Sequence, residues 1–466
     1  MDTTWRPNLA AHSGPKYLSL AHALREAVRN GVLAEGERLP PVREMAWQLS
    51  LTPGTVARAY QIATQEGLLE AQVGRGTFVA AQHPRIGPDQ SLVPETAFGA
   101  ETGAVDLRAP ELPDIGQAQV IAAAMRRAAD AIVPDWLDYP SLRRDRPTRE
   151  AVLGLMDPVR LGPMEADDIV LTHGGQNALN VVFQCCLTGE RPVIFAEELA
   201  YPGIRHAARL VRAEVVPIAI DAEGMRADAL DAACRRWGGR IVCLTAEAQN
   251  PTTVPMSERR RAEIVAVARA HDLQVIDDDC YSIANPTLTS LRALAPERVW
   301  YVASLSKTVS AGLRIGWILC PEGMGEVARL TAQHAFFGLS RPVTAIANEL
   351  IETGAVQDLR ARVQDVFARR LDMAVAVLGG FDLAWQPGLS FLWLRLPQGW
   401  RGSTFAREAE AAGVLVRSAD EYALGHGQAP HAVRIALTGA VSEDRFQAAL
   451  DSLARLLANP PGDIPV

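Results

Sequence analysis

The fold of this chain is decided by the stretch Ser304-Leu305-Ser306-Lys307-Thr308-Val309-Ser310-Ala311-Gly312-Leu313-Arg314. Lys307 is one of only two lysines in a chain with 46 basic residues, so arginine supplies nearly every positive charge. A primary amine can form a Schiff base with an aldehyde, whereas a guanidinium cannot. Two hydroxyls and Arg314 beside this amine suit a cofactor that is both a phosphate ester and an aldehyde, which describes pyridoxal phosphate. At this point the alternative is an ordinary exposed lysine at the end of a strand.

Length and composition narrow the class of protein. A chain of 466 residues suggests roughly three domains. Its 48% hydrophobic and 21% charged residues are typical of a soluble globular protein, and a net charge of −8 argues against a surface coated with basic residues. The six cysteines lack metal-ligand spacing, and no signal peptide or membrane span is visible. We therefore expect a cytoplasmic protein with free thiols and no metal.

The first eighty residues contain three helical patterns followed by a hairpin pattern. Apolar residues recur at helical spacing from Leu20, and a second short segment opens at Pro40-Pro41. Thr52 and Pro53 fit the cap and first position of a third helix. The apolar runs around Gly74-Arg75-Gly76 then predict a hairpin with an arginine at its tip. Together these elements predict a winged helix-turn-helix that binds the major groove of DNA; a small oligomerisation module is the alternative.

The segment from Lys16 to Ala80 resembles the GntR family of bacterial transcription regulators. The motifs that carry the resemblance are Gly36-Glu37-Arg38-Leu39-Pro40, Thr55-Val56-Ala57-Arg58-Ala59-Tyr60 and Gly74-Arg75-Gly76-Thr77-Phe78-Val79. The chain departs from the family at Pro53-Gly54, where a polar residue often begins the recognition helix, so fewer side chains there can read bases. The resemblance implies DNA contacts, with phosphate contacts supplying most of the affinity, by Arg43, Thr52, Thr55, Arg58 and Arg75.

Residues 81–103 contain several prolines and glycines without periodicity and are predicted to be a linker. Beyond them, β-like runs alternate with helical segments. This alternation predicts an α/β fold with a mostly parallel sheet covered by helices, and ligands then bind beyond the carboxyl ends of the strands. The predicted strands are Ile169–Leu171, Val193–Phe195, Ile241–Leu244, Gln274–Ile276, Val299–Ala303 and Ile315–Leu319.

Several of these strands are followed by residues with useful chemistry. Gly174-Gly175-Gln176 precedes a helix, whose N-terminal N–H groups and dipole favour a phosphate. Tyr201 could stack on a pyridine ring, and the amide of Asn250 could hydrogen-bond a phenolic oxygen. Taken alone, each of these has a simpler explanation in a turn or a core residue.

Three consecutive acids, Asp277-Asp278-Asp279, directly follow a predicted buried strand. Clustered carboxylates repel one another and resist desolvation, so their presence there needs a reason. One of them facing a protonated ring nitrogen would supply that reason. A metal site is the alternative, although no histidine lies near in sequence.

The order of these motifs resembles that of the fold-type I aminotransferases, over residues 104 to about 458. The resemblance implies that Lys307 forms the internal aldimine of pyridoxal phosphate and that Asp278 pairs with the pyridine nitrogen, keeping it protonated as an electron sink. It implies that Tyr281 and Asn250 bind the ring hydroxyl oxygen and that Tyr201 stacks on the ring. The residues implied to hold the phosphate are Gly175, Gln176, Ser304, Ser306 and Arg314.

Three further positions follow from the same resemblance. Tyr139 resembles the tyrosine that reaches the phosphate across a dimer interface. Arg434 resembles the strand arginine that binds a substrate carboxylate, a role for which a bidentate guanidinium contact is well suited. The alternative is an ordinary surface arginine. The family's Asn-Pro-Thr-Gly motif has Thr253 in place of its glycine, which affects the local turn geometry.

A GntR-type winged helix followed by an aminotransferase-like region is the arrangement of the MocR subfamily of regulators. We therefore predict a winged-helix domain at residues 1–80, a linker at 81–103, a large domain at 104–345 and a smaller α+β domain at 346–466. The resemblance implies a homodimer that binds operator DNA. The leading hypothesis is a transcription regulator that senses an amino compound by external aldimine formation at Lys307, with domain closure repositioning the DNA-binding domains.

Two other functions stay open from the sequence. One is an active aminotransferase that carries a DNA-binding appendage, since the residues for a first half-reaction are present. The other is a sensor of free pyridoxal phosphate that governs vitamin synthesis. The sequence names neither the effector nor the target genes, and it does not distinguish an activator from a repressor, although Arg434 favours a ligand with an acidic group.

Overall fold

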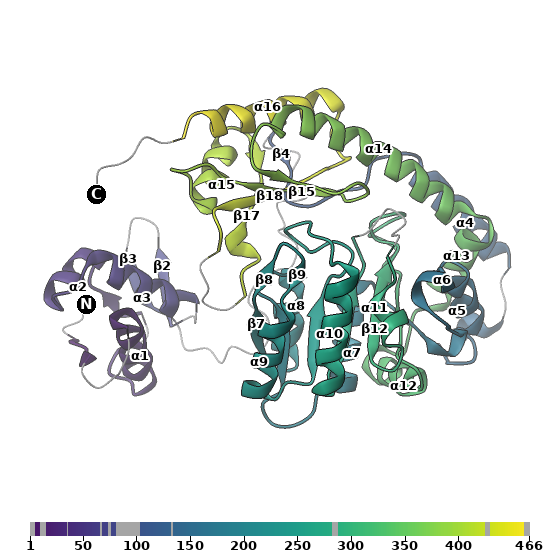
Figure 1. The fold of residues 1–466 in the computed structure, drawn as a ribbon, viewed down its shortest axis with the longest axis horizontal. Helices are drawn as coiled ribbons and strands as arrows, with labels where there is room; N and C mark the ends of the chain where they lie inside the picture. Colours follow the sequence, from purple (N-terminus) through teal and green to yellow (C-terminus); the bar gives the residue numbers. More distant parts are fainter. Residues whose placement is uncertain are drawn as a thin grey trace. The chain divides into compact units, whose positions relative to one another are not determined.

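The computed structural model describes residues 5–9, 15–34, 36–65, 68–72, 76–80, 103–131, 134–281, 288–424 and 429–460. The chain divides into two compact units, residues 1–89 and 90–466. Figure 1 labels the helices and strands of each unit.

Unit 1 consists of three helices and a small antiparallel sheet. The helices are α1 (Lys16–Arg29), α2 (Val42–Gln48) and α3 (Pro53–Gln65). The sheet has the order β1-β3-β2, formed by β1 (Arg38–Leu39), β2 (Leu69–Gln72) and β3 (Gly76–Val79). This is the predicted winged helix-turn-helix.

Local sequence chemistry explains where the third helix of unit 1 begins and how it is held. Thr52 Oγ1 accepts a hydrogen bond from Thr55 N at 3.3 Å, as a residue that caps a helix does, and Pro53 occupies the first helical position. Tyr60 of α3 is buried and donates its hydroxyl to Pro40 O at 2.9 Å. Leu20 and Leu24 of α1 lie fully buried against α2 and α3 in one apolar cluster.

Unit 2 is built on a seven-stranded sheet with the order β5-β13-β12-β11-β10-β6-β7. All neighbours pair in parallel except β13, which is antiparallel to both β5 and β12, so the predicted mostly parallel sheet is confirmed. Several of its strands, such as β10 and β13, are continuous apolar runs because both faces of the sheet are covered. The strands are β5 (Ile169–Thr172), β6 (Val193–Glu197), β7 (Glu214–Ile218), β10 (Ile241–Leu244), β11 (Gln274–Asp278), β12 (Val299–Ser304) and β13 (Gly316–Leu319).

Helices cover the two faces of this sheet and form separate apolar clusters with it. One face packs against α7 (Gly175–Cys186), α8 (Pro202–Leu210) and α12 (Gly325–Phe336). The other packs against α9 (Ala227–Trp237), α10 (Glu258–Ala270) and α11 (Leu291–Leu294). The remaining elements around this sheet are α4 (Gln117–Asp130), η3 (Pro134–Leu137), α5 (Arg146–Leu153), α6 (Pro158–Leu161), η4 (Ala166–Asp168), β8 (Ile220–Asp221), β9 (Gly224–Met225) and α13 (Arg341–Glu352).

A smaller four-stranded sheet with the order β14-β15-β18-β17 follows, and Figure 1 shows it with α14 and α16 above the large sheet. Its neighbouring strands are antiparallel. The elements of this part are α14 (Ala355–Leu378), β14 (Leu383–Ala384), β15 (Phe391–Arg395), α15 (Gly402–Ala411), β16 (Val414–Leu415), β17 (Arg417–Ser418), η5 (Ala419–Glu421), β18 (Ala432–Ala436) and α16 (Glu443–Ala458).

The chain enters unit 2 through this smaller part. Strand β4 (Val105–Asp106) pairs in parallel with β16, and Leu107 is fully buried in the cluster that α14, α15 and α16 form. The residues after β4 therefore pass across the small sheet before the chain reaches the large one. The predicted boundary between large and small domains at residue 345 stays a prediction.

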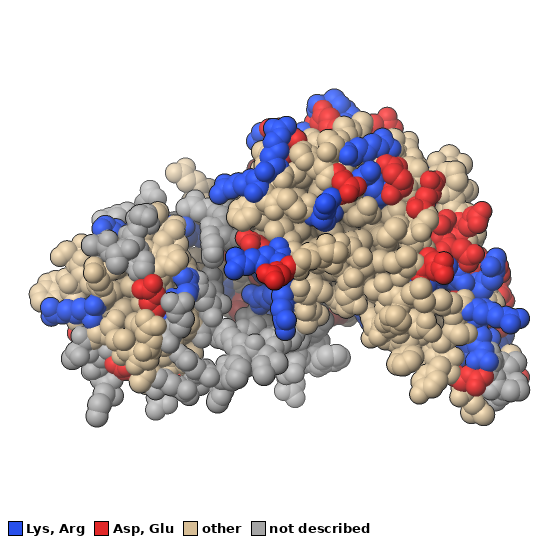
Figure 2. Space-filling view, turned by 90° about the horizontal axis from the view of Figure 1, so that it is seen from below, with Lys and Arg blue, Asp and Glu red and all other residues tan. Residues whose placement is uncertain are grey.

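Two surface properties bear on possible partners. On the face of unit 2 shown in Figure 2, basic and acidic side chains are interspersed. None of the helices in the described ranges has the length and apolar character that crossing a membrane requires.

Candidate functional site

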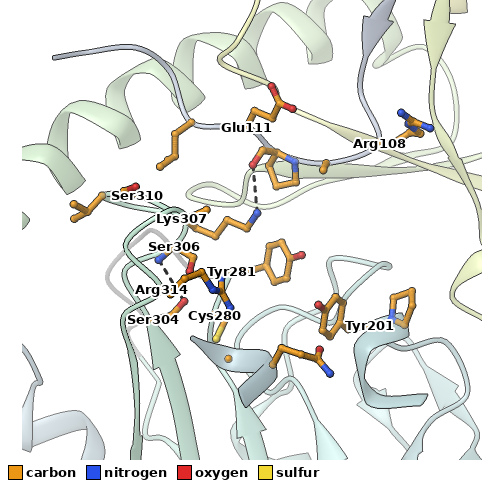
Figure 3. A pocket seen from close by; sticks show the side chains of 18 of the residues that line it. Arg108, Glu111, Tyr201, Cys280, Tyr281, Ser304, Ser306, Lys307, Ser310 and Arg314 are labelled. Atoms are coloured by element: carbon orange, nitrogen blue, oxygen red, sulfur yellow. Dashed lines mark hydrogen bonds between the residues drawn. The ribbon is translucent and has the colours of Figure 1, made fainter. Parts of the chain in front are cut away.

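A cavity of about 940 Å³ lies in unit 2 where the carboxyl ends of the large-sheet strands meet the small sheet. Its lining brings together Gly175, Gln176, Tyr201, Asp278, Tyr281, Ser304, Ser306, Lys307, Arg314 and Arg434. These residues come from five separate regions of the chain, and the sequence had singled out all of them. Figure 3 shows several of their side chains around the cavity.

Lys307 lies in the turn after β12, and its side chain extends toward the segment that carries Glu111 (Figure 3). Its Nζ donates to Pro110 O at 3.4 Å and lies 5.3 Å from the centroid of the Tyr281 ring. Lys307 is half-buried in the cavity wall, so it is not the freely exposed lysine of the alternative reading. The amine is placed where a ligand in the cavity can reach it.

The N-terminus of α7 forms one end of the cavity and has no room for larger side chains. A Cβ atom on Gly175 would lie 2.7 Å from Cys280 Sγ, and one on Gly174, whose φ is +82°, would lie 2.8 Å from Arg314 Nη2. Arg314 Nη2 donates to His173 O at 2.7 Å, which holds the guanidinium at this helix end. Unpaired N–H groups and the dipole of α7 favour an anion here, and Arg314 adds a positive charge.

The three consecutive aspartates have three different environments. Asp277 is fully buried, accepts from Ala246 N at 3.2 Å, and has a pKa that burial and the charge of Glu247 raise to about 6. Asp279 accepts from the hydroxyl of Tyr301 at 2.6 Å and from Arg160 at 3.1 Å. Only Asp278 lines the cavity, and burial raises its pKa. A cation beside Asp278 would therefore stabilise its ionised form.

Asn250 and Arg434 form a buried pair on the small-sheet side of the site. Arg434 Nη1 donates to Asn250 Oδ1 at 2.9 Å, and Arg434 Nη2 donates to Arg108 O at 2.8 Å. Arg434 is 3% exposed, which excludes the surface-arginine alternative. Asn250 Nδ2 is buried and has no hydrogen-bond partner among the described residues. An unpaired buried donor is costly, so this amide would be stabilised by an added oxygen acceptor. Asn250 itself is not among the residues that line the cavity.

Tyr201 and Gln176 lie together at the start of α8. Gln176 Nε2 donates to Gly203 O at 2.9 Å, so its donor is already used within the protein, while its Oε1 is buried without a partner in the described part of the chain. This engagement leaves Gln176 in the cavity wall but weakens the expectation that its side chain donates to a phosphate. Burial raises the pKa of Tyr201, which keeps its phenol neutral.

Some predicted residues lie outside this cluster. Tyr139 is 77% exposed and stacks on Phe337 with ring centroids 5.3 Å apart, and it does not line the cavity.

In unit 1, Arg43 and Thr52 are exposed, and Thr52 Oγ1 lies 2.8 Å from Thr55 Oγ1.

The remaining two predicted DNA contacts have different outcomes. The guanidinium of Arg58 stacks on the ring of Tyr17 at 4.1 Å, so the protein already holds this side chain against α1. Arg75 lies outside the described residues.

The sequence reasoning missed several residues of the cavity wall. Arg205 of α8 donates to the carbonyl oxygens of Ala423 and Glu421, at 3.2 and 3.4 Å. Arg417 lines the same cavity and forms a 3.4 Å ion pair with Glu421. No local pattern marks these arginines, because they approach the site only through pairing of the small-sheet strands and the packing of α8.

Comparison with known families agrees with this geometry. The family model described as aminotransferase class I and II matches residues 103–453. The chain belongs to the class I and II aminotransferase family. Its aminotransferase-like domain is similar to a kynurenine aminotransferase from Pyrococcus horikoshii, with a TM-score of 0.68 and 22% identity over 77% of this chain and 91% of that one. An archaeal alanine:glyoxylate aminotransferase gives a TM-score of 0.67 with 22% identity over 76% and 91%.

A second family, described as bacterial regulatory proteins of the gntR family, matches residues 16–79, ahead of the aminotransferase-like domain. Such a domain implies binding to DNA. The HTH-type regulator YdeF of Bacillus subtilis is 28% identical over 97% of both chains. The pyridoxine biosynthesis regulator PdxR of Corynebacterium glutamicum is 25% identical over 77% of this chain and 78% of its own. The two matches together give the domain arrangement of the MocR subfamily, as the sequence predicted.

The aminotransferase-like domain implies pyridoxal phosphate, and the residues present fit it. The cavity-lining carboxyl of Asp278 matches a protonated ring nitrogen, and the N-terminus of α7 together with Arg314 matches a phosphate. Asn250 Nδ2, buried and without a partner in the described part of the chain, offers a donor for a ring oxygen. Lys307 is the primary amine at this cavity. Within the described ranges, no group of three or more histidine, cysteine or acidic residues could hold a metal ion.

Proposed function

We propose that this protein is a transcription regulator that binds operator DNA through unit 1 and senses an amino compound through pyridoxal phosphate at Lys307. The observation that carries the proposal is the position of Lys307 Nζ in a cavity that also holds Asp278 and Arg434, in a chain whose residues 16–79 match a GntR-type domain. When bound, pyridoxal phosphate supplies an aldehyde that condenses with a primary amine and a ring that accepts electrons.

The residues of the site would then share the binding of the cofactor. Asp278 would hold a proton on the ring nitrogen, because a buried carboxylate is stabilised by an adjacent cation. Asn250 would donate its free Nδ2 to the ring oxygen, and Tyr281 lies close enough to Lys307 to share that role. Tyr201 would pack on the ring. Gly175, Gln176, Ser304, Ser306 and Arg314 would hold the phosphate, mainly through the α7 N-terminus and the Arg314 guanidinium.

Arg434 would bind an acidic group of the effector. Its five N–H groups exceed the two hydrogen bonds that it makes to Asn250 and Arg108, so donors remain for a carboxylate. Because Arg434 lies on the small sheet and Lys307 follows a large-sheet strand, an effector that contacts both would link the two parts of unit 2. We propose that this linkage alters how the DNA-binding units are placed in a homodimer.

An exposed aromatic pair supports the homodimer. Tyr139 and Phe337 are 77% and 59% exposed and stack on each other, although large aromatic side chains are usually covered. A second copy of the chain is the proposed cover, and Tyr139 would then approach the phosphate site of that copy. Cross-linking or sedimentation of Tyr139→Ser against wild type tests this contact.

The central experiment is a titration of the cofactor-loaded full-length protein with candidate amines. Absorbance and binding to its own upstream DNA are followed together. Lys307→Ala is expected to abolish both the cofactor's lysine-linked absorbance and the effector-dependent change in DNA affinity, because no other amine at the cavity replaces Lys307. If the variant kept both responses, the proposal would be wrong.

The same titration decides the main alternative, an aminotransferase with a DNA-binding appendage. Absorbance that shifts and then stays constant supports sensing. Steady conversion of the cofactor to its amine form with release of a keto acid supports turnover. A response of DNA affinity to pyridoxal phosphate alone, without any amine, would instead indicate a sensor of the vitamin.

A further inference from the structure

The small-sheet side of the cavity contains a second arginine, Arg417, which the proposed function does not use. Arg417 of β17 and Arg434 of β18 are direct partners in the antiparallel register of these strands. Directly opposed residues point to the same face of a sheet with their Cβ atoms roughly 5 Å apart. Both arginines line the cavity, so the two guanidinium groups face the same ligand space.

Neither guanidinium is saturated by the protein. Arg417 Nε and Arg434 Nε are both buried without a hydrogen-bond partner among the described residues. Arg417 has one charged partner, Glu421, at 3.4 Å, and the Glu421 side chain is 45% exposed. Because solvent reaches the Glu421 carboxylate, it screens this ion pair and reduces its contribution. Like charges directly opposed on a sheet destabilise it. An anion bound between Arg417 and Arg434 would therefore stabilise this part of the sheet.

The surroundings place Arg417 near the ring-binding region of the cavity. Burial raises the pKa of Tyr201, and the positive charge of Arg417 opposes that rise, which reflects their proximity. Burial likewise raises the pKa of Tyr422, and the charges of Arg434 and Arg417 oppose it. Arg108, the other arginine beside Arg434, is already neutralised by Asp106 through contacts of 3.0 and 2.6 Å. Arg417, whose Nε has no partner in the described part of the chain, can therefore bind a second anionic group.

We propose that the effector carries two acidic groups, one bound by Arg434 and the second by Arg417, so that the regulator responds to an amino dicarboxylate or a close analogue. This inference rests on the proposed function, because it names the ligand class of the same site. Arg205, which donates to the backbone oxygens of Ala423 and Glu421, holds the segment after β17 in place and acts as a positioning residue.

The test compares isosteric ligands that differ by one charge. The cofactor-loaded full-length protein is titrated by absorbance with aspartate against asparagine and with glutamate against glutamine. Aspartate or glutamate, whichever the wild type binds more tightly, is expected to bind at least about 10-fold more tightly than its own amide. The reason is that the amide loses a charge-assisted bidentate contact. Arg417→Gln is expected to bring that ratio close to 1 and to leave the affinity for alanine nearly unchanged.

Glu421→Gln is the matched control, because it removes the same ion pair and keeps the guanidinium. If Arg417 binds ligand, Glu421→Gln keeps or increases the preference for the acid. If the ion pair is only structural, both variants weaken all ligands alike and lower the melting temperature together. That result, or a wild-type ratio near 1, overturns the inference while leaving the amine response of the proposed function intact.

A second measurement does not depend on amine chemistry. Succinate has two carboxylates and no amine, and succinamate has one carboxylate in nearly the same shape. Calorimetry of the wild type should show succinate binding at least about 10-fold more tightly, with the difference lost in Arg417→Gln. Equal binding of the two would refute the second acidic subsite even if no amine changes the absorbance.

Discussion

The two sides of the cavity differ in how far the protein satisfies the hydrogen-bond donors of its arginines. On the strand-end side, formed by Gly175, Asp278, Ser304 and Arg314, glycines pack against side chains and the Arg314 guanidinium is fixed on a backbone oxygen. On the small-sheet side, formed by Arg417, Glu421, Tyr422 and Arg434, buried nitrogens have no partner in the described part of the chain. The first arrangement suits one invariant ligand, the cofactor, and the second suits ligands that exchange.

Replacing Asp278 should produce the largest effect, because it removes a buried charge from the strand-end side. Asp278→Asn is expected to weaken pyridoxal phosphate binding roughly 100-fold or more, since leaving one member of a buried ion pair alone costs about 3–5 kcal/mol. Fluorescence or absorbance titration of the apoprotein with pyridoxal phosphate measures this.

Asp279→Asn is the matched control for that variant. It changes the neighbouring acid, which contacts Arg160 and Tyr301 and does not line the cavity. It should lower the melting temperature and leave cofactor affinity within a few-fold of wild type. Equal losses of cofactor affinity in the two variants would contradict the separate environments of the two carboxyls.

Replacing Arg434 should have a smaller effect that is confined to the small-sheet side. Arg434→Gln is expected to weaken amines that carry a carboxylate by roughly 10- to 100-fold, because hydrogen bonds to charged groups contribute about 1.5–3 kcal/mol. Amines without an acidic group should lose little. A comparable loss of cofactor affinity would show that the two sides are not independent, through the contact of Arg434 with Asn250.

The last prediction concerns Glu197, a buried acid that accepts hydrogen bonds from Thr245 and Gln249, and it is a change of stability that depends on pH. Burial raises the pKa of Glu197 to about 8, although Gln249 and Thr245 donate to Oε2. The folded protein therefore binds a proton that the unfolded chain lacks between about pH 4.5 and 8, so stability falls as pH rises through this window.

Glu197→Gln cannot ionise and should remove that part of the pH dependence. Relative to wild type, its stability should increase by up to roughly 1.4 kcal/mol per pH unit through the window, with little difference near pH 4.5 and the largest near pH 8. Thermal or urea unfolding at several pH values measures the difference. A constant difference across pH would indicate that Glu197 is ionised in the fold.

Much of the architecture followed from the sequence because local chemistry sets it. The predicted strands of the large sheet lie within or beside the observed ones, except that Glu214–Ile218 was not predicted and forms the edge strand β7. That strand includes Pro217, which ordinarily argues against a strand and is tolerated at an edge. The winged-helix elements were also predicted, because Thr52-Pro53 and the glycine-flanked hairpin act over a few residues.

The roles of neighbouring residues were only partly predictable. Successive residues of a strand point to opposite faces, so Asp278 had to face away from Asp277 and Asp279. Which of the two faces of β11 borders the cavity depended on the packing of α7 against the sheet. Likewise, the sequence singled out Arg58 for DNA, whereas its stacking on Tyr17 depends on the approach of α1 and α3.

The sequence by itself determined the family of folds, the amine at Lys307 and the set of groups around a phosphorylated aldehyde, because these depend on residue type and order. Only the tertiary structure decided that Arg417 stands opposite Arg434, that Asn250 Nδ2 is left unpaired and that Tyr139 stays outside the cavity. The physical reason is that strand register and helix packing bring together residues that are distant in the chain. No local sequence pattern shows which distant residues come into contact.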